Sequence, residues 1–492
     1  MKTLAYIMTL SAMLLAGSVV SFAHAADDSH IPYGDQFAVQ VSDGTAWRDV
    51  AVLSVPVDRV ENGRHNTETS SVACFDMENP VTVRVIHRRG AIREARIRPS
   101  SLQVPFEQTD SVTLLLTIDK PANLSVEVNG DIYHNLQLFA SAPFVEPKPQ
   151  CGTHVIRFPA GYHRLERGRM DLPSHTLVIV DPGAYVEGGF RIVGQHDVQV
   201  VGRGFVRPAG RGYGVEITSS HDILVEGIVT TQVPTGGSHA VTIRNVRSMT
   251  HYGWGDGLNV FASTDVLIDG CFARNSDDCH TVYATRLGHI GSSRNITVQN
   301  SVLWADVAHP IFIGLHGAAS YKKDVAGRHM RYAQNPDSVI LRTDTIEHLV
   351  YRNLDILEQR EAQVDYQGCL AIGCGDNNLV RDVLFEDIRV EPIHCGQLLF
   401  LRVFHNEKYC QAPGTAIRDV TFRRVTYAGG NDNLSLIEGW SAERPVSGVH
   451  FQDLTIAGRH ICDTMPGKPS WYKTADFARI FIGNHVTDVT FE

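Results

Sequence analysis

Three aspartates have the residue type and the spacing to carry out acid–base chemistry together. Asp256 lies in the segment Trp-Gly-Asp-Gly-Leu-Asn, and Asp277 and Asp278 follow 21 residues later in Asn-Ser-Asp-Asp-Cys. If successive coils of a repeated structure place these carboxylates on one surface, they raise one another's pKa, so that one stays protonated while another ionises. Breaking a glycosidic bond requires an acid and a base of this kind. The pattern therefore predicts an enzyme that cleaves polysaccharides.

Aromatic residues accompany the aspartates. Tyr252 and Trp254 lie beside Asp256, and Trp304 and His309 fall on the following coil. The C–H faces of sugars pack on aromatic rings, so Trp254 and Trp304 are candidate substrate platforms. Asp-Gly and Asp-Asp are also common in turns, but a turn alone does not account for the aromatic neighbours. We therefore interpret the three aspartates as catalytic.

The chain from residue 151 to 492 repeats one phrase, which must form the scaffold for these residues. A turn residue is followed by strand-forming residues at alternate positions and then by a second short strand, at intervals of roughly 20–30 residues. Examples start at 196, 221, 240, 265, 295 and 419. The repeat leaves no room for a helix and is shorter than the ~40–45 residues of a propeller blade. It predicts an all-β protein built on a parallel β-helix.

The β-helix explains how the aspartates could meet. Neighbouring coils lie one inter-strand spacing apart, ~4.8 Å, so Asp256 would lie close to the later pair if their strands are in register. Adjacent residues of a regular strand point to opposite faces. Asp277 and Asp278 therefore both reach one groove only at a bend, which the preceding polar residues Asn275 and Ser276 favour.

The residues before the repeat form two segments. Residues 1–25 resemble a secretory signal peptide, with Lys2 at the positive end, a mostly apolar stretch and a small-x-small site ending at Ala25. We expect cleavage after Ala25 and a secreted or periplasmic protein without a membrane span. Residues 26–145 show alternating β runs, which predict a small β-sandwich domain. Three prolines between 143 and 149 form a stiff linker. We expect the sandwich to dock near the first coils and to contribute little chemistry.

Charge and cysteine content limit the classes of molecule that the protein can bind. The formal net charge of −10 disfavours a nucleic acid, although a local basic groove can still bind an acidic polysaccharide. The nine cysteines are an odd number, and Cys369–Cys374 and Cys395–Cys410 are candidate disulfides. The chain has no Cys-x-x-Cys motif, so we predict no zinc site, no other metal and no cofactor. The sequence does not specify the oligomeric state.

The motifs resemble those of the pectin-hydrolysing polygalacturonases of glycoside hydrolase family 28. Asp256-Gly, Asp277-Asp278-Cys and His309-Pro match that family's successive Asn-Thr-Asp, Gly-Asp-Asp and Gly-His-Gly motifs, and the resemblance covers roughly residues 151–460. The preceding sandwich is instead similar to the dextranases and isopullulanases of family 49. The resemblance implies a right-handed parallel β-helix. It also implies that Asp277 is the general acid, that Asp256 and Asp278 activate water with inversion, and that His309 supports the site.

The chain departs from the family 28 pattern at several positions. Gly255 replaces a threonine, Ala308 and Pro310 flank the histidine, and an extra segment, 286–293, lengthens the preceding coil. The family's carboxylate-binding Arg-Ile-Lys motif is not recognisable. Candidate basic replacements are Lys322, Lys323, Arg342 and Arg402. For Arg342 and Arg402 an exterior salt bridge is an equal alternative. His316 and Tyr321, in an insertion at 315–331, are further candidate substrate contacts.

Four functions remain open at this stage. The first is hydrolysis of a pectic polysaccharide, and the second is hydrolysis of a neutral α-glucan, as in dextranases. The third is a polysaccharide lyase, in which the aspartates would bind Ca²⁺, but Arg274 is the only basic residue between Asp256 and Cys279. The fourth is a non-catalytic glycan binder, which has no use for three crowded aspartates. The sequence favours a hydrolase with a polysaccharide or oligosaccharide substrate.

Overall fold

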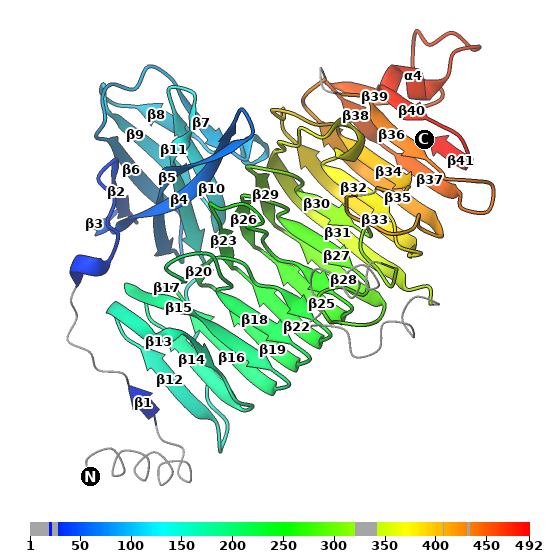
Figure 1. Cartoon of the computed structure of the whole chain (residues 1–492). Helices are drawn as coiled ribbons and strands as arrows, with labels where there is room; N and C mark the ends of the chain where they lie inside the picture. The colour runs from blue at the N-terminus through cyan, green and yellow to red at the C-terminus, as the bar shows by residue number, and fades with distance from the viewer. Residues whose placement is uncertain (1–18, 22–27, 320–341, 407, 431–432) are drawn as a thin grey trace.

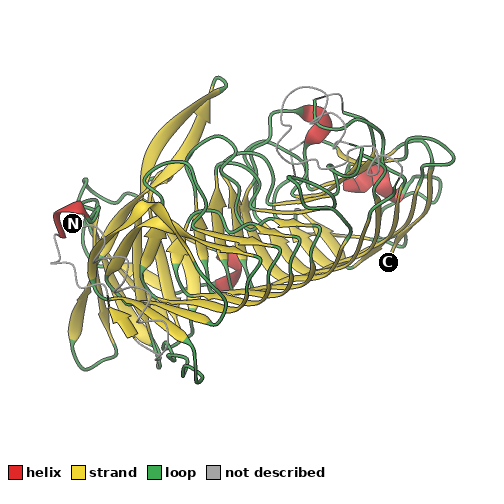
Figure 2. Cartoon of the chain, turned by 60° about the horizontal axis from the view of Figure 1, so that its bottom comes forward, coloured by secondary structure: helices red, strands yellow, loops and turns green. Residues whose placement is uncertain are grey.

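The computed structural model describes residues 19–21, 28–319, 342–406, 408–430 and 433–492. Strands dominate these residues and form one 31-stranded, almost wholly parallel assembly and two five-stranded sheets. Figure 1 shows the small sheets packed against the side of a long stack of coils, and Figure 2 shows the coils following one another along one axis. The predicted fold class, a parallel β-helix preceded by a β-sandwich, is confirmed.

The β-sandwich encloses a small apolar core of its own. Alternate residues of β2 and β6 are buried, among them Val39, Val83 and Val85, which is the period of strands with one face inward. One sheet has the order β4 (Val52–Glu61), β5 (Arg64–Asp76), β11 (Asp131–Ser141), β10 (Ala122–Val128) and β7 (Ala95–Arg98). The other has the order β3 (Trp47–Val50), β2 (Phe37–Ser42), β6 (Val81–His87), β9 (Thr113–Ile118) and β8 (Phe106–Gln108).

The β-helix consists of three ladders of parallel strands. The first ladder begins with β12 (His154–Phe158), which also pairs with the short β1 (Val19–Ser21). It continues through β14 (Thr176–Val180), β16 (His196–Gly202), β19 (His221–Glu226), β22 (His239–Arg244), β25 (Thr264–Asp269), β28 (Ser293–Gln299), β31 (Thr345–Glu358), β33 (Leu379–Val390), β35 (Ala416–Tyr427), β37 (Val446–Gln452) and β41 (Val486–Phe491).

The other two ladders both begin in the long strands β13 (Gly161–Asp171) and β15 (Ala184–Val193). The second comprises β17 (Phe205–Arg207), β20 (Val229–Thr230), β23 (Arg247–Met249), β26 (Phe272–Asn275), β29 (Val302–Ala305), the ends of β31, β33 and β35, and β38 (Leu454–Ile456). The third comprises β18 (Val215–Thr218), β21 (Thr235–Gly236), β24 (Val260–Phe261), β27 (His280–Tyr283), β30 (Ile311–Ile313), β32 (Leu370–Cys374), β34 (Leu399–Val403), β36 (Ser435–Glu438) and β40 (Ile480–Ile482).

The interior of the β-helix is apolar along its whole length. The repeat places equivalent residues of successive coils above one another, so the sequence pattern becomes a stack of like side chains. The clearest case is an aromatic stack with ring centroids 4.7–5.0 Å apart, formed by Tyr351, Phe385, Phe422, Phe451 and Phe491. This spacing matches the distance between neighbouring strands, so the coils keep one register over many repeats.

The sandwich packs on the outer surface of the second ladder. In Figure 1, β10 and β11 lie beside β23 and β26. Apolar residues of β4, β5 and β11 form one buried cluster with ladder residues that run from Phe205 on β17 to Leu357 on β31. The buried Arg98 adds charged contacts: its Nε donates to Glu391 at 2.8 Å and its Nη1 to Glu127 at 3.1 Å. The sandwich was predicted to dock near the first coils, but it contacts the coils from β17 to β31.

The candidate disulfides do not form. The thiols of Cys369 and Cys374 donate to Gln359 and to the Asn378 carbonyl, and those of Cys395 and Cys410 donate to backbone carbonyls of other residues. Neither of the two candidate pairs is bridged in this structure. Within the described ranges, every helix is too short or too polar to cross a membrane.

Candidate active site

The three aspartates lie at the same turn of successive coils, between the second and third ladders. Asp256 follows β23 and precedes β24, Asp277 and Asp278 separate β26 from β27, and His309 separates β29 from β30. Backbone hydrogen bonds hold these turns in register: Gly257 N donates to the Asp278 carbonyl at 2.9 Å, and Cys279 N donates to the His309 carbonyl at 2.9 Å. The expected stacking of the aspartates on one surface follows from this register.

A buried polar network produces the bend that brings both members of the Asp277–Asp278 pair to the same side. The Asn275 amide donates to the Asp256 carbonyl and to Thr250 Oγ1, each at 3.1 Å, and Ser276 N donates to the same Thr250 oxygen at 3.0 Å. These bonds replace the regular ladder bonds at the turn. Gly255 is required there, since a Cβ would lie 2.2 Å from Ser276 Oγ.

Asp278 is paired with a buried histidine. His309 has 0% exposure, its Nδ1 donates to Asp278 Oδ1 at 2.7 Å, and its Nε2 donates to the Tyr366 carbonyl at 2.5 Å. Both partners accept hydrogen bonds, so the ring carries two protons and a positive charge. Burial acts to lower the pKa of His309, but Asp278 and Glu361 outweigh it and raise that pKa. The Asp278 carboxyl group therefore accepts a charge-assisted hydrogen bond from a buried cationic ring.

Asp277 and Asp256 are shifted the other way. Burial raises the pKa of Asp277 well above its usual range, and the charges of Asp256 and Asp278 add to the effect. Burial, followed by Asp278, also raises the pKa of Asp256 to about 7, although Arg286 and a 2.5 Å hydrogen bond from Asn259 act against it. The site thus places a carboxyl group with a raised pKa, Asp277, beside Asp278, which accepts a hydrogen bond from His309. An acid and a base of a hydrolase occupy contrasting environments of this kind.

The aspartates open into a cavity of about 1280 Å³. One wall comes from the sandwich, because the tip of the β4–β5 hairpin lines the cavity through residues 60–65. His65 of this hairpin approaches Gly253, beside Trp254. The sandwich thus borders the cavity, whereas the expectation that it contributes little chemistry stays a prediction. Turns of the β-helix supply the other walls.

Four cationic side chains line this cavity, and they are absent from the sequence-based candidates. Arg211 lies 4.6 Å from the Trp254 ring, Arg286 4.8 Å from the Tyr283 ring and Lys408 4.6 Å from the Tyr409 ring; the fourth is Arg360. Within the described part of the chain, none of the four forms an ion pair with a carboxylate at 4.0 Å or less. The extra segment 286–293 was the one sequence signal for any of them.

Only some of the predicted substrate contacts line the cavity. Trp254 does so with 74% exposure, and His316 lies edge-on to Tyr283 at 5.1 Å. Trp304 does not: it is fully buried beneath the sandwich between Arg98 and Arg274, with ring distances of 4.9 and 4.2 Å. Its assignment as a sugar platform is wrong, because the sandwich covers that face of the ladder.

The predicted basic contacts lie elsewhere. Arg342 pairs with the buried Asp344 at 2.6 Å, and Arg402 pairs with Glu438 on the next strand at 2.9 Å. Neither arginine lines the cavity. Both form ion pairs within the protein, as the alternative interpretation expected. The prediction that they contact the substrate is therefore wrong. Tyr321 and Lys322 lie outside the described residues. The sequence also missed Glu361, a further carboxylate in the cavity wall.

Among the described residues, the ligand atoms of three or more Asp, Glu, His or Cys side chains converge within 4.8 Å at one place only, on the first ladder. The aspartates Asp256, Asp277 and Asp278 are not such a group.

Comparison with known proteins identifies the fold. No family model and no curated protein matches the sequence. Among solved structures, Dex49A from Penicillium minioluteum is similar over 97% of both chains, with 11% identity and a TM-score of 0.57. A family 28 exopolygalacturonase from Yersinia enterocolitica has 10% identity over 83% of this chain and 96% of its own, with a TM-score of 0.47. The catalytic domain of a GH87 α-1,3-glucanase has 10% identity over 93% and 98%, with a TM-score of 0.36. The similarity to Dex49A spans the sandwich and the β-helix alike.

Proposed function

We propose that this protein is a glycoside hydrolase that cleaves a polysaccharide within the cavity around Asp256, Asp277 and Asp278. The observation that carries the proposal is the contrast between neighbouring carboxyl groups: burial and like charges raise the pKa of Asp277, while Asp278 accepts a 2.7 Å hydrogen bond from the buried His309. A glycan binder or a structural turn has no need for this costly arrangement. The shared fold with Dex49A is compatible with this activity.

In the proposed mechanism Asp277 donates its proton to the leaving glycosidic oxygen as the bond to the anomeric carbon breaks. Asp278 accepts a proton from the attacking water, and Asp256 helps to hold that water. The reaction inverts the anomeric carbon, because water attacks directly from the face opposite to the leaving group. His309 does not touch substrate, and its hydrogen bond keeps Asp278 in place.

NMR spectroscopy of the first-formed product tests the mechanism. Inversion is the expected result, and a retained anomer would mean that a carboxylate forms a covalent intermediate. An absence of product from homogalacturonan, rhamnogalacturonan, dextran and pullulan, together with saturable binding of one of them, would favour the glycan-binding alternative. Products that absorb as unsaturated uronates would favour the lyase.

We propose further that the substrate is acidic. The four cavity cations have no carboxylate partner within the described residues, and the Nη1 of Arg286 is buried without a hydrogen-bond acceptor. A buried guanidinium group without an acceptor is energetically costly. An anionic group of the substrate would remove this cost when the substrate binds. A uronate carboxylate supplies such an anion, and a planar guanidinium binds it in two-pronged fashion.

Arg286→Gln tests the charge of the substrate. A lost hydrogen bond to a charged group is worth about 1.5–3 kcal/mol, so KM for an acidic oligosaccharide should rise about 10- to 100-fold. KM for a neutral oligosaccharide should stay unchanged. Arg294→Gln is the matched control, because Arg294 is exposed on the nearby β28. If wild-type protein hydrolyses dextran or pullulan but no acidic polymer, a neutral α-glucan is the substrate.

Export of the protein is the remaining proposal, and it rests on the signal-like residues 1–25. The expected mature N-terminus is Ala26, because cleavage follows Ala25. N-terminal sequencing of the protein recovered from the periplasm or the culture medium checks this. Recovery of the intact chain from the cytoplasm of its own cells would contradict export.

A further inference from the structure

A line of histidines crosses the first ladder, at a distance from the catalytic cavity. His196 pairs with His221 and His221 with His239 at the first position of successive strands, and His175 occupies the corresponding turn before β14. The four rings follow one another at centroid distances of 4.8–5.2 Å. Thr264 takes the next position and ends the line. None of these residues lines the catalytic cavity.

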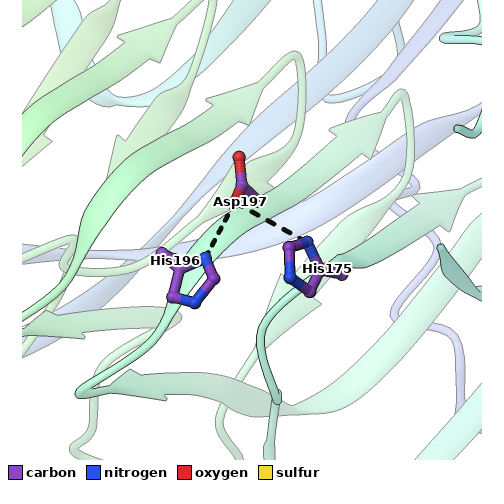
Figure 3. A group of neighbouring side chains, drawn as sticks. All are labelled: His175, His196 and Asp197. Carbon is purple, nitrogen blue, oxygen red and sulfur yellow. Dashed lines mark hydrogen bonds and ion pairs between the residues drawn. The ribbon is translucent and has the colours of Figure 1, made fainter. Parts of the chain in front are cut away.

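One ring breaks the regular stack. The planes of His196 and His221 differ by 8° and those of His221 and His239 by 19°, whereas His175 stands at 88° to His196. This rotation brings His175 Nδ1 to 3.6 Å from Asp197 Oδ2. The same oxygen lies 2.8 Å from His196 Nδ1. Figure 3 shows both imidazoles directed at this carboxylate, each from its own coil.

Two separations among the three ligand atoms bracket the value that a small divalent ion needs, and the third is within 4.8 Å. His175, His196 and Asp197 each offer one atom, and all three atoms lie within 4.8 Å of one another. Zinc binds histidine nitrogen and carboxylate oxygen at ~2.0–2.2 Å, so two ligands of a tetrahedral ion are ~3.3 Å apart. The observed 2.8 and 3.6 Å lie on either side of this value. Small side-chain rotations therefore suffice to admit the ion.

The backbone around these ligands is held in place. Ser174 N and Ser174 Oγ both donate to Gln195 Oε1 at 2.8 Å, and His196 N donates to Ser174 Oγ at 3.1 Å. His175 N donates to the His196 carbonyl at 3.1 Å. The two turns that carry the ligands are thus fixed to each other before any ion binds. The side chains remain 41–59% exposed, which leaves a path for the ion and a position for water.

We infer that His175, His196 and Asp197 bind one divalent transition-metal ion, Zn²⁺ in the first instance, as a clamp between the first coils of the β-helix. Two imidazoles and a carboxylate suit Zn²⁺ and its neighbours better than Mg²⁺ or Ca²⁺, which prefer oxygen ligands. The ion would join the turn before β14 to the start of β16. It would stabilise the N-terminal end of the solenoid and take no part in hydrolysis.

The ordinary alternative is an exposed His–Asp pair with no ligand, and the chain contains a control for it. His348 pairs with Asp382 on the same ladder, and both are exposed. Within the described residues, no further His, Cys, Asp or Glu side chain completes that pair into a group of three. A substitution at His348 therefore removes the same kind of contact without removing a proposed metal ligand.

Titration of metal-stripped full-length protein with Zn²⁺ by calorimetry tests the inference. Wild type and His348→Ala should bind one ion with equal affinity, and His175→Ala and His196→Ala should each weaken binding at least tenfold. Zn²⁺ should raise the melting temperature of wild type and of His348→Ala, since a ligand that binds only the folded state stabilises it. The same addition should leave the two ligand variants unchanged.

Three results would overturn the metal site: no saturable binding by wild type, an equal loss in His348→Ala, or an anomalous zinc peak in crystals away from His175 and His196. Hydrolysis is measured in parallel on the same variants. Activity should persist in all of them, because these residues lie outside the cavity. These measurements therefore test the metal site and the proposed hydrolase activity independently.

Discussion

Replacing Asp256 by asparagine should make the protein more stable at alkaline pH while removing its activity. Burial raises the pKa of Asp256 from an ordinary 3.8 to about 7, with Asp278 as the next cause. At ~1.36 kcal/mol per pH unit, ionising this carboxyl in the folded chain costs on the order of 4 kcal/mol more than in the unfolded chain. An amide never ionises, and its oxygen still accepts the hydrogen bond from Asn259.

The sign follows from linkage. A carboxyl whose pKa is higher in the folded state contributes stability below its unfolded pKa, and that contribution is lost as pH rises through the folded value. The free energy of unfolding of Asp256→Asn should thus match wild type near pH 4 and exceed it at pH 9, by up to the order of 4 kcal/mol. The gain should develop mainly between pH 4 and pH 7.

Urea unfolding followed by circular dichroism at a series of pH values measures this difference. Asp265→Asn is the control, since Asp265 is an exposed aspartate near the start of β25, and it should show no such pH-dependent gain. A difference between Asp256→Asn and wild type that is the same at pH 4 and pH 9 would refute the reasoning. So would a variant that is less stable than wild type at pH 9.

Three further predictions concern catalysis. Asp277→Asn should lower kcat by ~10²–10⁴-fold, the usual contribution of a general acid, with substrate affinity by calorimetry retained; activity within a few-fold of wild type would remove Asp277 from that role. His309→Gln removes a hydrogen bond to a charge worth about 1.5–3 kcal/mol. kcat should then fall by about 10- to 100-fold, and an unchanged kcat would show that His309 does not position Asp278. Shortening the β4–β5 hairpin at residues 60–65 should raise KM for long substrates about tenfold with kcat unchanged, because the tip lines the cavity without touching the aspartates; unchanged KM would mean that substrate does not reach it.

The β-helix and the turn that carries the aspartates could be predicted because the contacts that form them are local in sequence. Each coil repeats the alternation of the previous one, and an interval of 21 residues returns the chain from Asp256 to the same turn at Asp277. Even the bend was visible in the polar Asn275 and Ser276. The periodicity alone carried this information, since a solenoid coil contacts only its neighbours.

The walls of the cavity could not be predicted in the same way. Trp304 occupies an outward ladder position like those that bind sugars, and only the docked sandwich makes it a core residue. Arg211 and Lys408 come from turns almost 200 residues apart, and no local pattern marks their convergence. Arg402 was a candidate basic contact for the substrate, but strand register across a coil pairs it with Glu438.

The docking of the sandwich against the second ladder also dictates when the cleft can exist. Contacts within the β-helix can form coil by coil as the chain is made, because they join residues about one repeat apart. The contact of Arg98 with Glu391 joins residues 293 positions apart, and such long-range closures form late in folding. The sandwich is synthesised first, and its apolar β4–β5–β11 face is fully covered only when the coils from β17 to β31 have been added. Since the same docking places the hairpin over the aspartates, an incomplete chain has the carboxylates but lacks one wall of the cleft. Assembly of the protein and completion of its substrate site are therefore one event.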